Sequence, residues 1–283
     1  MQSLRRNAAT GFVIASLLVA VTFAATRKEY RFTVAPGANI SVDTHYGAIA
    51  VKPGSGHQAL VVALPQSDKV EVDSHQTGNR IAVESHLLQG ADSQTGRVDY
   101  EVTVPQGVTL ALHSSTGPMT ADGVEGDLFF ETAAAPIDVR GVSNGHVHIH
   151  TMKGPITLTD IRDAHVDITS IDADVHLNSV TGPLVQVNSG SGKIFYDGDF
   201  GSGGDYTLVT HTGDIEALVP ATASASFQAH SVRGQVQNDL PLEPIPHTRL
   251  AFDAQRAFIG TVGKSASKVV LRSFSGRIHL KQR

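Results

Sequence analysis

A short turn motif with a glycine at its centre recurs along the chain about every 19 to 21 residues. Its copies are Ser115-Thr116-Gly117-Pro118-Met119, Met152-Lys153-Gly154-Pro155-Ile156, Gly190-Ser191-Gly192-Lys193-Ile194, His211-Thr212-Gly213-Asp214-Ile215, Val232-Arg233-Gly234-Gln235-Val236 and Phe274-Ser275-Gly276-Arg277-Ile278. A fixed period of this length predicts stacked structural units, because one such unit cannot bury its own apolar face.

The turn positions follow one another at regular intervals. Gly117, Ala135, Gly154, Ala173 and Gly192 lie 18 or 19 residues apart, Gly192, Gly213 and Gly234 lie 21 apart, and Gly276 follows after 42. The last interval leaves room for one degenerate unit. Because alanine replaces glycine at two turns, we expect crowding by neighbouring backbone to matter there as much as a positive φ.

Apolar residues keep a fixed register around each turn. The residues two positions past the turn are Met119, Ile137, Ile156, Val175, Ile194, Ile215, Val236 and Ile278. Further apolar residues alternate with positions interpreted as polar, so each unit is predicted to form two short strands with one face inward. A third apolar position, occupied by Val124, Val142, Ile161 and Val180, indicates a second corner.

These patterns predict an all-β fold, a parallel β-solenoid or single-stranded β-helix with about 19 to 21 residues per coil. Equivalent positions carry the same residue type, which favours parallel stacking with like side chains above one another. The general preference of crossover connections predicts right-handed winding.

The chain divides into three predicted regions. Residues 1–25 read as a cleaved secretory signal, because Arg5 and Arg6 precede an apolar run that ends in small residues near Ala24 and Ala25; a retained membrane anchor is the alternative. Residues 27–107 are expected to form a β region that caps the solenoid, and Tyr46-Gly47-Ala48 resembles the turn of an early unit. Residues 108–283 are expected to form the repeats, with a Pro-rich loop at 239–248 and a closing unit at 258–281.

Composition narrows the function classes. The chain has no cysteine, so disulfides and thiolate chemistry are excluded. The net charge of −5 and the scattered basic residues argue against nucleic-acid binding. Aromatic residues are only 6% and tryptophan is absent, which disfavours carbohydrate-stacking platforms. No cofactor is predicted.

The closing segment and the preceding Ser/Thr-Gly-x-Ile turns resemble the bacterial β-strand-repeat domains of a putative-adhesin family, whose function is unknown. The resemblance spans about residues 38 to 281 and includes Val269-Val270-Leu271 and Phe274-Ser275-Gly276-Arg277-Ile278. It implies a fold and an exported binding or structural role, and it supplies no catalytic residue.

Histidine is the one overused polar residue, with 14 copies. His146, His148 and His150 are expected on the outward face of one strand. Offsets of 19 residues predict that their neighbours are Asp127, His165, Asp167 and Glu131. Such a face could bind a transition metal, but a solvated face with cross-strand charge pairs is the favoured interpretation, and no metal site is predicted.

The same histidines could give a pH response. Loss of Arg5 and Arg6 would take the formal charge from −5 to −7, and protonation of all 14 histidines would bring it to +7. Because histidine titrates around pH 6, adhesion to anionic envelope polymers would then rise on acidification. The simpler interpretation is that histidine only fills exposed strand positions.

A glycan-active β-helix enzyme is the main alternative, because such enzymes place carboxylates on one face. The candidate carboxylates are Asp122, Asp138, Asp160, Asp172, Asp174, Asp197, Asp199 and Asp214. They occupy different offsets from the turn and are not expected to converge, so no catalytic residue is predicted. The favoured function is an exported, non-catalytic binding or structural surface in the cell envelope. Its expected partner is an envelope protein or a surface polysaccharide, and a membrane-tethered scaffold is a further alternative.

Overall fold

The computed structural model describes residues 27–200, 203–241, 243–244, 255–264 and 266–283. The predicted signal at residues 1–25 and half of the predicted Pro-rich loop, residues 242 and 245–248, lie outside these ranges. The described residues form strands and turns, and none of their segments is a helix long and apolar enough to span a membrane.

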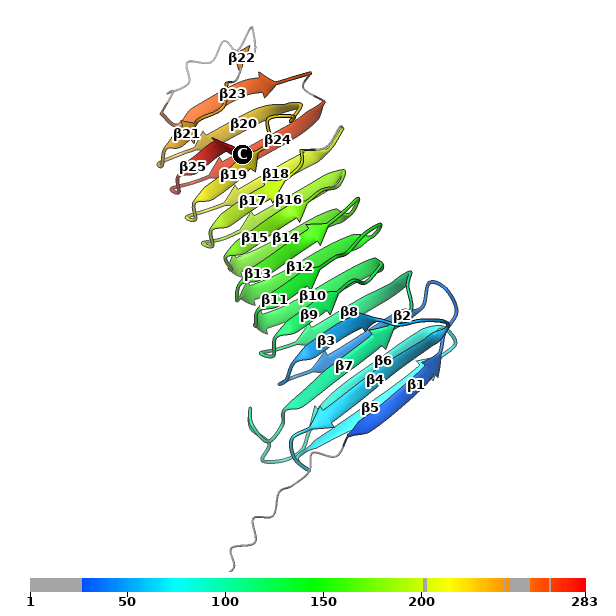
Figure 1. The fold of residues 1–283 in the computed structure, drawn as a ribbon. Coiled ribbons are helices and arrows are strands. Elements are labelled where there is room, and N and C mark those ends of the chain that lie inside the picture. The colour runs from blue at the N-terminus through cyan, green and yellow to red at the C-terminus, as the bar shows by residue number, and fades with distance from the viewer. Residues whose placement is uncertain (1–26, 201–202, 242, 245–254, 265) are drawn as a thin grey trace, which may run out of the picture.

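The described strands belong to two long sheets that run the length of an elongated stack (Figure 1). The 12-stranded sheet contains, in spatial order, β1 (Lys28–Thr33), β4 (Gln58–Pro65), β7 (Val98–Val104), β3 (Ile49–Pro53), β9 (Met119–Asp122), β11 (Ile137–Arg140), β13 (Ile156–Ile161), β15 (Val175–Val180), β17 (Ile194–Gly198), β19 (Ile215–Val219), β25 (Ile278–Gln282) and β21 (Val236–Asn238). The 13-stranded sheet contains β22 (Glu243–Pro244), β23 (Ala257–Val262), β20 (Ala225–Ser231), β24 (Ser267–Ser273), β18 (Asp205–Thr210), β16 (Leu184–Ser189), β14 (His165–Asp172), β12 (His146–Lys153), β10 (Gly126–Ala134), β8 (Val108–Ser114), β2 (Asn39–Thr44), β6 (Arg80–Leu87) and β5 (Val70–Thr77).

Most neighbouring strands are parallel and in register with their counterparts one coil away, where a coil is one strand from each sheet and the turns that join them. Ile137 lies beside Ile156, which lies beside Val175, which lies beside Ile194. The all-β prediction is confirmed, and the two largely parallel sheets have the stacking of a β-solenoid. Its handedness stays a prediction.

The core lies between the inward faces of the two sheets. In most strands every second residue points into it, as in Leu128 and Phe130 of β10, which are at most 2% exposed. The expected second-corner residues Val124, Val142, Ile161 and Val180 are buried as well. Fully burying such a side chain contributes about 1.5–3 kcal/mol, and stacking is what removes both of its sides from water.

The glycine corners are crowded by the coil beneath them. A methyl group at Gly192 would overlap the carbonyl oxygen of Ala173, and one at Gly213 would overlap that of Gly192. Of the six turn glycines, only Gly154 has a positive φ. Contact between adjacent coils, more than backbone handedness, therefore requires glycine at these corners.

A column of buried hydroxyl groups follows the corners, and five of them, at Ser114, Ser189, Thr210, Ser231 and Ser273, join a turn amide to a carbonyl of a neighbouring coil. Thr210 accepts a hydrogen bond from the Gly213 amide (3.1 Å) and donates to the carbonyl of Gly192 in the coil below (3.1 Å). Equivalent buried hydroxyls stand three residues before the other turns, at Ser114, Thr132, Thr151, Ser170, Ser189, Ser231 and Ser273. Each hydroxyl of this kind can satisfy two backbone groups that would otherwise be buried without partners.

The stacking order at the C-terminal end differs from the order expected from the spacing. The turn at Gly234 was expected to stack on the turn at Gly213, but β25 lies between β19 and β21, and β24 lies between β18 and β20. The closing segment is thus inserted into the stack, and the C-terminus in Figure 1 lies among the coils. Antiparallel β23 and the two-residue edge strand β22 follow beyond β20.

The N-terminal end has a similar arrangement. The coil of β2 and β3 lies directly against the coil of β8 and β9, although about 55 residues separate them in the sequence. On its other side lie β6 and β7, which are also parallel to it. Antiparallel β1, β4 and β5 complete this end.

Candidate functional site: the histidine face

The outward side chains of β2, β8, β10, β12 and β14 form one continuous surface, which we call the histidine face. Its members are Asp43, His113, Asp127, Phe129, Glu131, His146, His148, His150, His165 and Asp167. These side chains point outward because the apolar residues between them point into the core.

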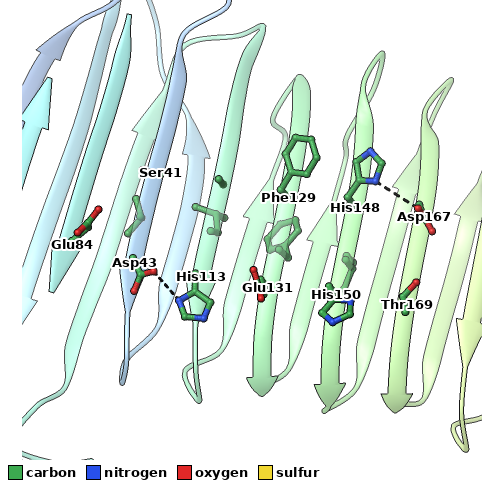
Figure 2. A pocket seen from close by; sticks show the side chains of 15 residues that line it. Ser41, Asp43, Glu84, His113, Phe129, Glu131, His148, His150, Asp167 and Thr169 are labelled. Carbon is green, nitrogen blue, oxygen red and sulfur yellow. Dashed lines mark hydrogen bonds and ion pairs between the residues drawn. The ribbon is translucent and has the colours of Figure 1, made fainter. Parts of the chain in front are cut away.

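Three imidazole–carboxylate pairs cross between neighbouring strands of this face. The Nδ1 atom of His146 lies 2.6 Å from an oxygen of Asp127. The Nδ1 atom of His113 lies 2.9 Å from an oxygen of Asp43, a pair that Figure 2 shows. The His148 Nδ1 atom lies 3.8 Å from Asp167. The six side chains are 39 to 46% exposed, so each pair is expected to contribute at most about 1 kcal/mol.

Ring stacking adds a second kind of order. The rings of Phe129 and His148 are parallel within 3°, with centroids 4.8 Å apart. His146 meets His165 edge to face, with centroids 4.7 Å apart. Parallel strands place residues of adjacent coils at about this spacing, so in-register rings stack along the sheet.

The register expected from the 19-residue offset is present. Opposite His146 lies His165, opposite His148 lies Asp167, and opposite His150 lies Glu131. In the part of the chain that the structure describes, no group of three or more histidines, aspartates or glutamates could hold a metal ion. The imidazoles are arranged as a row of pairs and do not converge on one point.

A shallow hollow of about 400 Å³ lies in the histidine face and is open to solvent. Side chains of β2, β6, β8, β10, β12 and β14 line it, among them Ser41, Ala111, Phe129 and Glu131 (Figure 2). The hollow lies over outward residues with small side chains, Ser41 and Ala111.

Sequence reasoning missed three members of this surface and Glu84 of β6, which lines the hollow beside them. Asp43, Glu84 and His113 come together because β2 pairs with β6 on one side and with β8 on the other, which no 19-residue offset predicts. The outward positions were interpreted as polar, and this is wrong at position 129. An aromatic residue, Phe129, points outward there and is 41% exposed. An aromatic residue between the inward Leu128 and Phe130 was the available signal.

Several of the carboxylates considered for catalysis have structural partners. Asp138 binds Arg140 (2.7 Å), and Asp197 binds Arg283 (2.7 Å). At the glycine corners, Asp174 accepts a hydrogen bond from the Lys193 amide. Two further bonds are of a similar kind: Asp214 accepts from the Arg277 amide, and Asp172 accepts from the Ser191 hydroxyl. The Asp138–Arg140 pair lies within β11, the other contacts link coils, and none of them gathers the carboxylates into one cleft.

The fold and its sites define a class, an all-β protein of two long, largely parallel sheets stacked as in a β-solenoid. A model of the Toastrack DUF4097 family matches residues 38–281, and the chain therefore belongs to this family, whose domain has no known function. The resemblance to β-strand-repeat domains is thereby confirmed.

The solved structures similar to this chain include the following three. A "putative cell adhesion protein" from Clostridium sporogenes has 13% identity and a TM-score of 0.30, with 91% of this chain and 100% of that one covered. A "putative adhesin" from Bacteroides fragilis has 10% identity and a TM-score of 0.32, with 90% and 96% covered. A "putative adhesin" from Parabacteroides distasonis has 10% identity and a TM-score of 0.29, with 92% and 98% covered. No curated protein matches this chain.

Proposed function

We propose that this protein is exported and that its long, flat sheet faces act as a non-catalytic binding or structural surface in the bacterial cell envelope. The observation that carries the proposal is the histidine face, where parallel register repeats outward side chains at each coil. Such a surface can make many weak contacts with an extended partner, and their sum gives useful avidity. The expected partner is an envelope protein or a surface polysaccharide.

Export is supported by residues 1–25, whose basic start, apolar run and small-residue end are typical of a secretory signal. Binding without turnover is supported by the roles of the carboxylates. Asp138, Asp197 and Asp214 each engage an arginine, so their charges are already neutralised by structural partners.

The test combines cell fractionation with a binding assay on the full-length chain expressed in a bacterial host. We expect an exported product whose N-terminus begins near residue 25 and which binds purified envelope material saturably. A full-length product in the cytosol would contradict the proposal. An unprocessed N-terminus in the membrane fraction would instead favour a tethered scaffold.

The pH response is tested in the same assay. Protonation of the histidines is expected to make the surface more positive, so binding to an anionic envelope polymer should rise between pH 7 and pH 5. A neutral polymer of the same length serves as the control. Equal binding to the anionic polymer at both pH values would remove this part of the proposal.

A further inference from the structure

One column of the histidine face contains a gap beside an aromatic ring. In spatial order the column is Ser41, Ala111, Phe129, His148 and Asp167. On one side Phe129 stacks on His148 at 4.8 Å. On the other side its neighbour is Ala111, whose side chain is a single methyl group, so the second face of the ring borders the hollow.

The next column supplies polar groups along the same hollow. Its members in consecutive coils are Glu84, Asp43, His113, Glu131 and His150, and all five line the hollow (Figure 2). Among the described residues, the side chains of Glu131 and His150 have no hydrogen-bond or ion-pair partner within the protein. The polar groups of this second column therefore lie two residues, or about 7 Å, further along each strand than the exposed face of the Phe129 ring.

The charge of the hollow limits what can enter it. Its lining contains Asp43, Glu84, Glu131 and Asp167, together with three histidines and no lysine or arginine. The hollow is thus acidic, so it repels phosphates and uronic acids and accepts neutral or ammonium-bearing groups.

We propose that the hollow binds one pyranose unit of a neutral or amino-bearing glycan. The apolar face of the sugar ring would stack on Phe129 in the space over Ala111 and continue the ring column by one coil. Its hydroxyl or ammonium groups would bind Glu131 and His113. This inference rests on the proposed function and names its partner class as a polysaccharide.

A single aromatic platform is consistent with the low aromatic content of the chain. Because one sugar ring buries little area, its affinity for this hollow is expected to be on the order of 1 mM. Useful binding to an envelope polysaccharide would then come from many copies of the protein along one polymer.

The test is an NMR titration of the full exported protein with three tetrasaccharides of matched length, made of glucosamine, N-acetylglucosamine or galacturonic acid. We expect the first two to bind, with shifts at Ala111 and Phe129, and the acidic one to bind at least tenfold more weakly. Equal binding of the acidic tetrasaccharide would overturn the charge argument and with it the proposal.

Two substitutions locate the site. Phe129→Ala removes the platform, and Ala111→Phe fills the gap with a protein ring; each is expected to reduce binding at least tenfold. Phe195→Ala, a partly exposed outward phenylalanine of the 12-stranded sheet beside His176, is the matched control and should bind as the wild type does. Wild-type affinity in both hollow variants would overturn the proposal.

A cationic protein segment is the competing occupant, because an arginine side chain also stacks on an aromatic ring. An arginine tetrapeptide that binds through Phe129 when none of the tetrasaccharides does would contradict the glycan proposal. Export and envelope binding are scored separately, so loss of sugar binding with retained envelope binding refutes this inference alone. A cytosolic protein would refute the proposed function while the titration still tests the hollow.

Discussion

The middle of the stack and its two ends are built by different rules. From β8 to β19, the order of strands along each sheet is the order along the chain. At both ends the order changes, and a coil near one chain terminus lies between the regular stack and a segment from further inside the sequence. Repetition determines the middle, whereas the ends must solve the problem of an open sheet edge.

The two ends solve this problem in the same way. The coil of β2 and β3 pairs on both sides, and so does the coil of β24 and β25. Neither terminal coil can fray, because ladder hydrogen bonds hold it from above and below. Three of the four outermost strands, β1, β5 and β22, pair antiparallel with their neighbours, and only β21 is a parallel edge strand among the described residues.

The largest expected effect comes from deleting residues 267–283, which removes β24 and β25 from inside the stack. The deletion removes four fully buried side chains, Val269, Leu271, Ile278 and Leu280, and separates β20 and β21 from the rest. Losing each such side chain costs about 2–5 kcal/mol, so the total of about 8–20 kcal/mol is comparable with the whole stability of a domain.

Thermal unfolding and hydrogen exchange measure this effect. We expect loss of protection in β20 and β21 as well as a lower melting temperature. Deletion of Arg283 alone is the control, because it removes one exposed ion pair and should cost at most about 1 kcal/mol. Retained protection of β20 and β21 in the long deletion would contradict the inserted position of the closing coil.

Loss of a corner hydroxyl should have the next largest effect. The loss of unfolding free energy should be similar at Thr210 in the middle of the stack and at Ser231 at its C-terminal end. Thr210→Val and Ser231→Ala each leave a buried glycine amide and a carbonyl without a partner, at an expected cost of about 1–3 kcal/mol. Thr207→Val on the outward face of β18 is the control and should change stability by less than about 0.5 kcal/mol. Denaturant unfolding measures all three, and a cost at Thr207 equal to that at Thr210 would refute the role of the hydroxyl column.

Two buried tyrosines sharpen the comparison further. In the middle, the Tyr196 hydroxyl donates to the Val180 carbonyl (3.0 Å), so Tyr196→Phe should cost about 1 kcal/mol. At the N-terminal end, the buried Tyr100 hydroxyl has no hydrogen-bond partner in the described residues, and burial raises its pKa. Tyr100→Phe should therefore be neutral or slightly stabilising in denaturant unfolding, and a loss as large as that of Tyr196→Phe would show that Tyr100 is hydrogen-bonded.

The smallest effect is electrostatic and lies where β25 meets the end of β21. A hydrogen bond between His279 and Asp239 (2.7 Å) lowers the pKa of the Asp239 carboxyl. At pH values above the ordinary aspartate pKa, the lowered carboxyl pKa stabilises the folded state. This stabilisation is lost as the pH falls through the pKa of the folded state. NMR titration should show His279→Gln raising the pKa of Asp239 while Asp92, whose pKa is lowered by Thr95 and Gln94, stays unchanged. An unaltered Asp239 pKa would mean that the two residues are not partners.

The sequence predicted the repetitive part of this molecule because its signals are local. Glycine corners, apolar columns and the 19-residue offset follow from one coil resting on the next, and the partners of His146, His148 and His150 followed from that offset. The ends could not be predicted from spacing, since pairs such as Asp43 with His113 join strands across a long excursion.

The candidate site lies at the border between these two regimes. The part of the site on β10, β12 and β14 could be predicted from the 19-residue period. The part on β2, β6 and β8 could not, because β2 lies between β6 and β8, which is not their order along the chain. The sequence also contains the pattern of the hydroxyl column, a serine or threonine three residues before each turn. Its role could not be predicted, because the carbonyl groups that accept these hydrogen bonds belong to the neighbouring coil.

Engineered disulfides test the stacking order most directly, because the chain has no cysteine of its own. Glu216 on β19 lies beside His279 on β25, and His279 lies beside Gln237 on β21. Cysteines at 216 and 279 should cross-link on oxidation, whereas cysteines at 216 and 237 are two coils apart, at about 10 Å, and should not. Efficient cross-linking of 216 with 237, and none of 216 with 279, would show that the coils follow the order of the sequence and would contradict the structure described above.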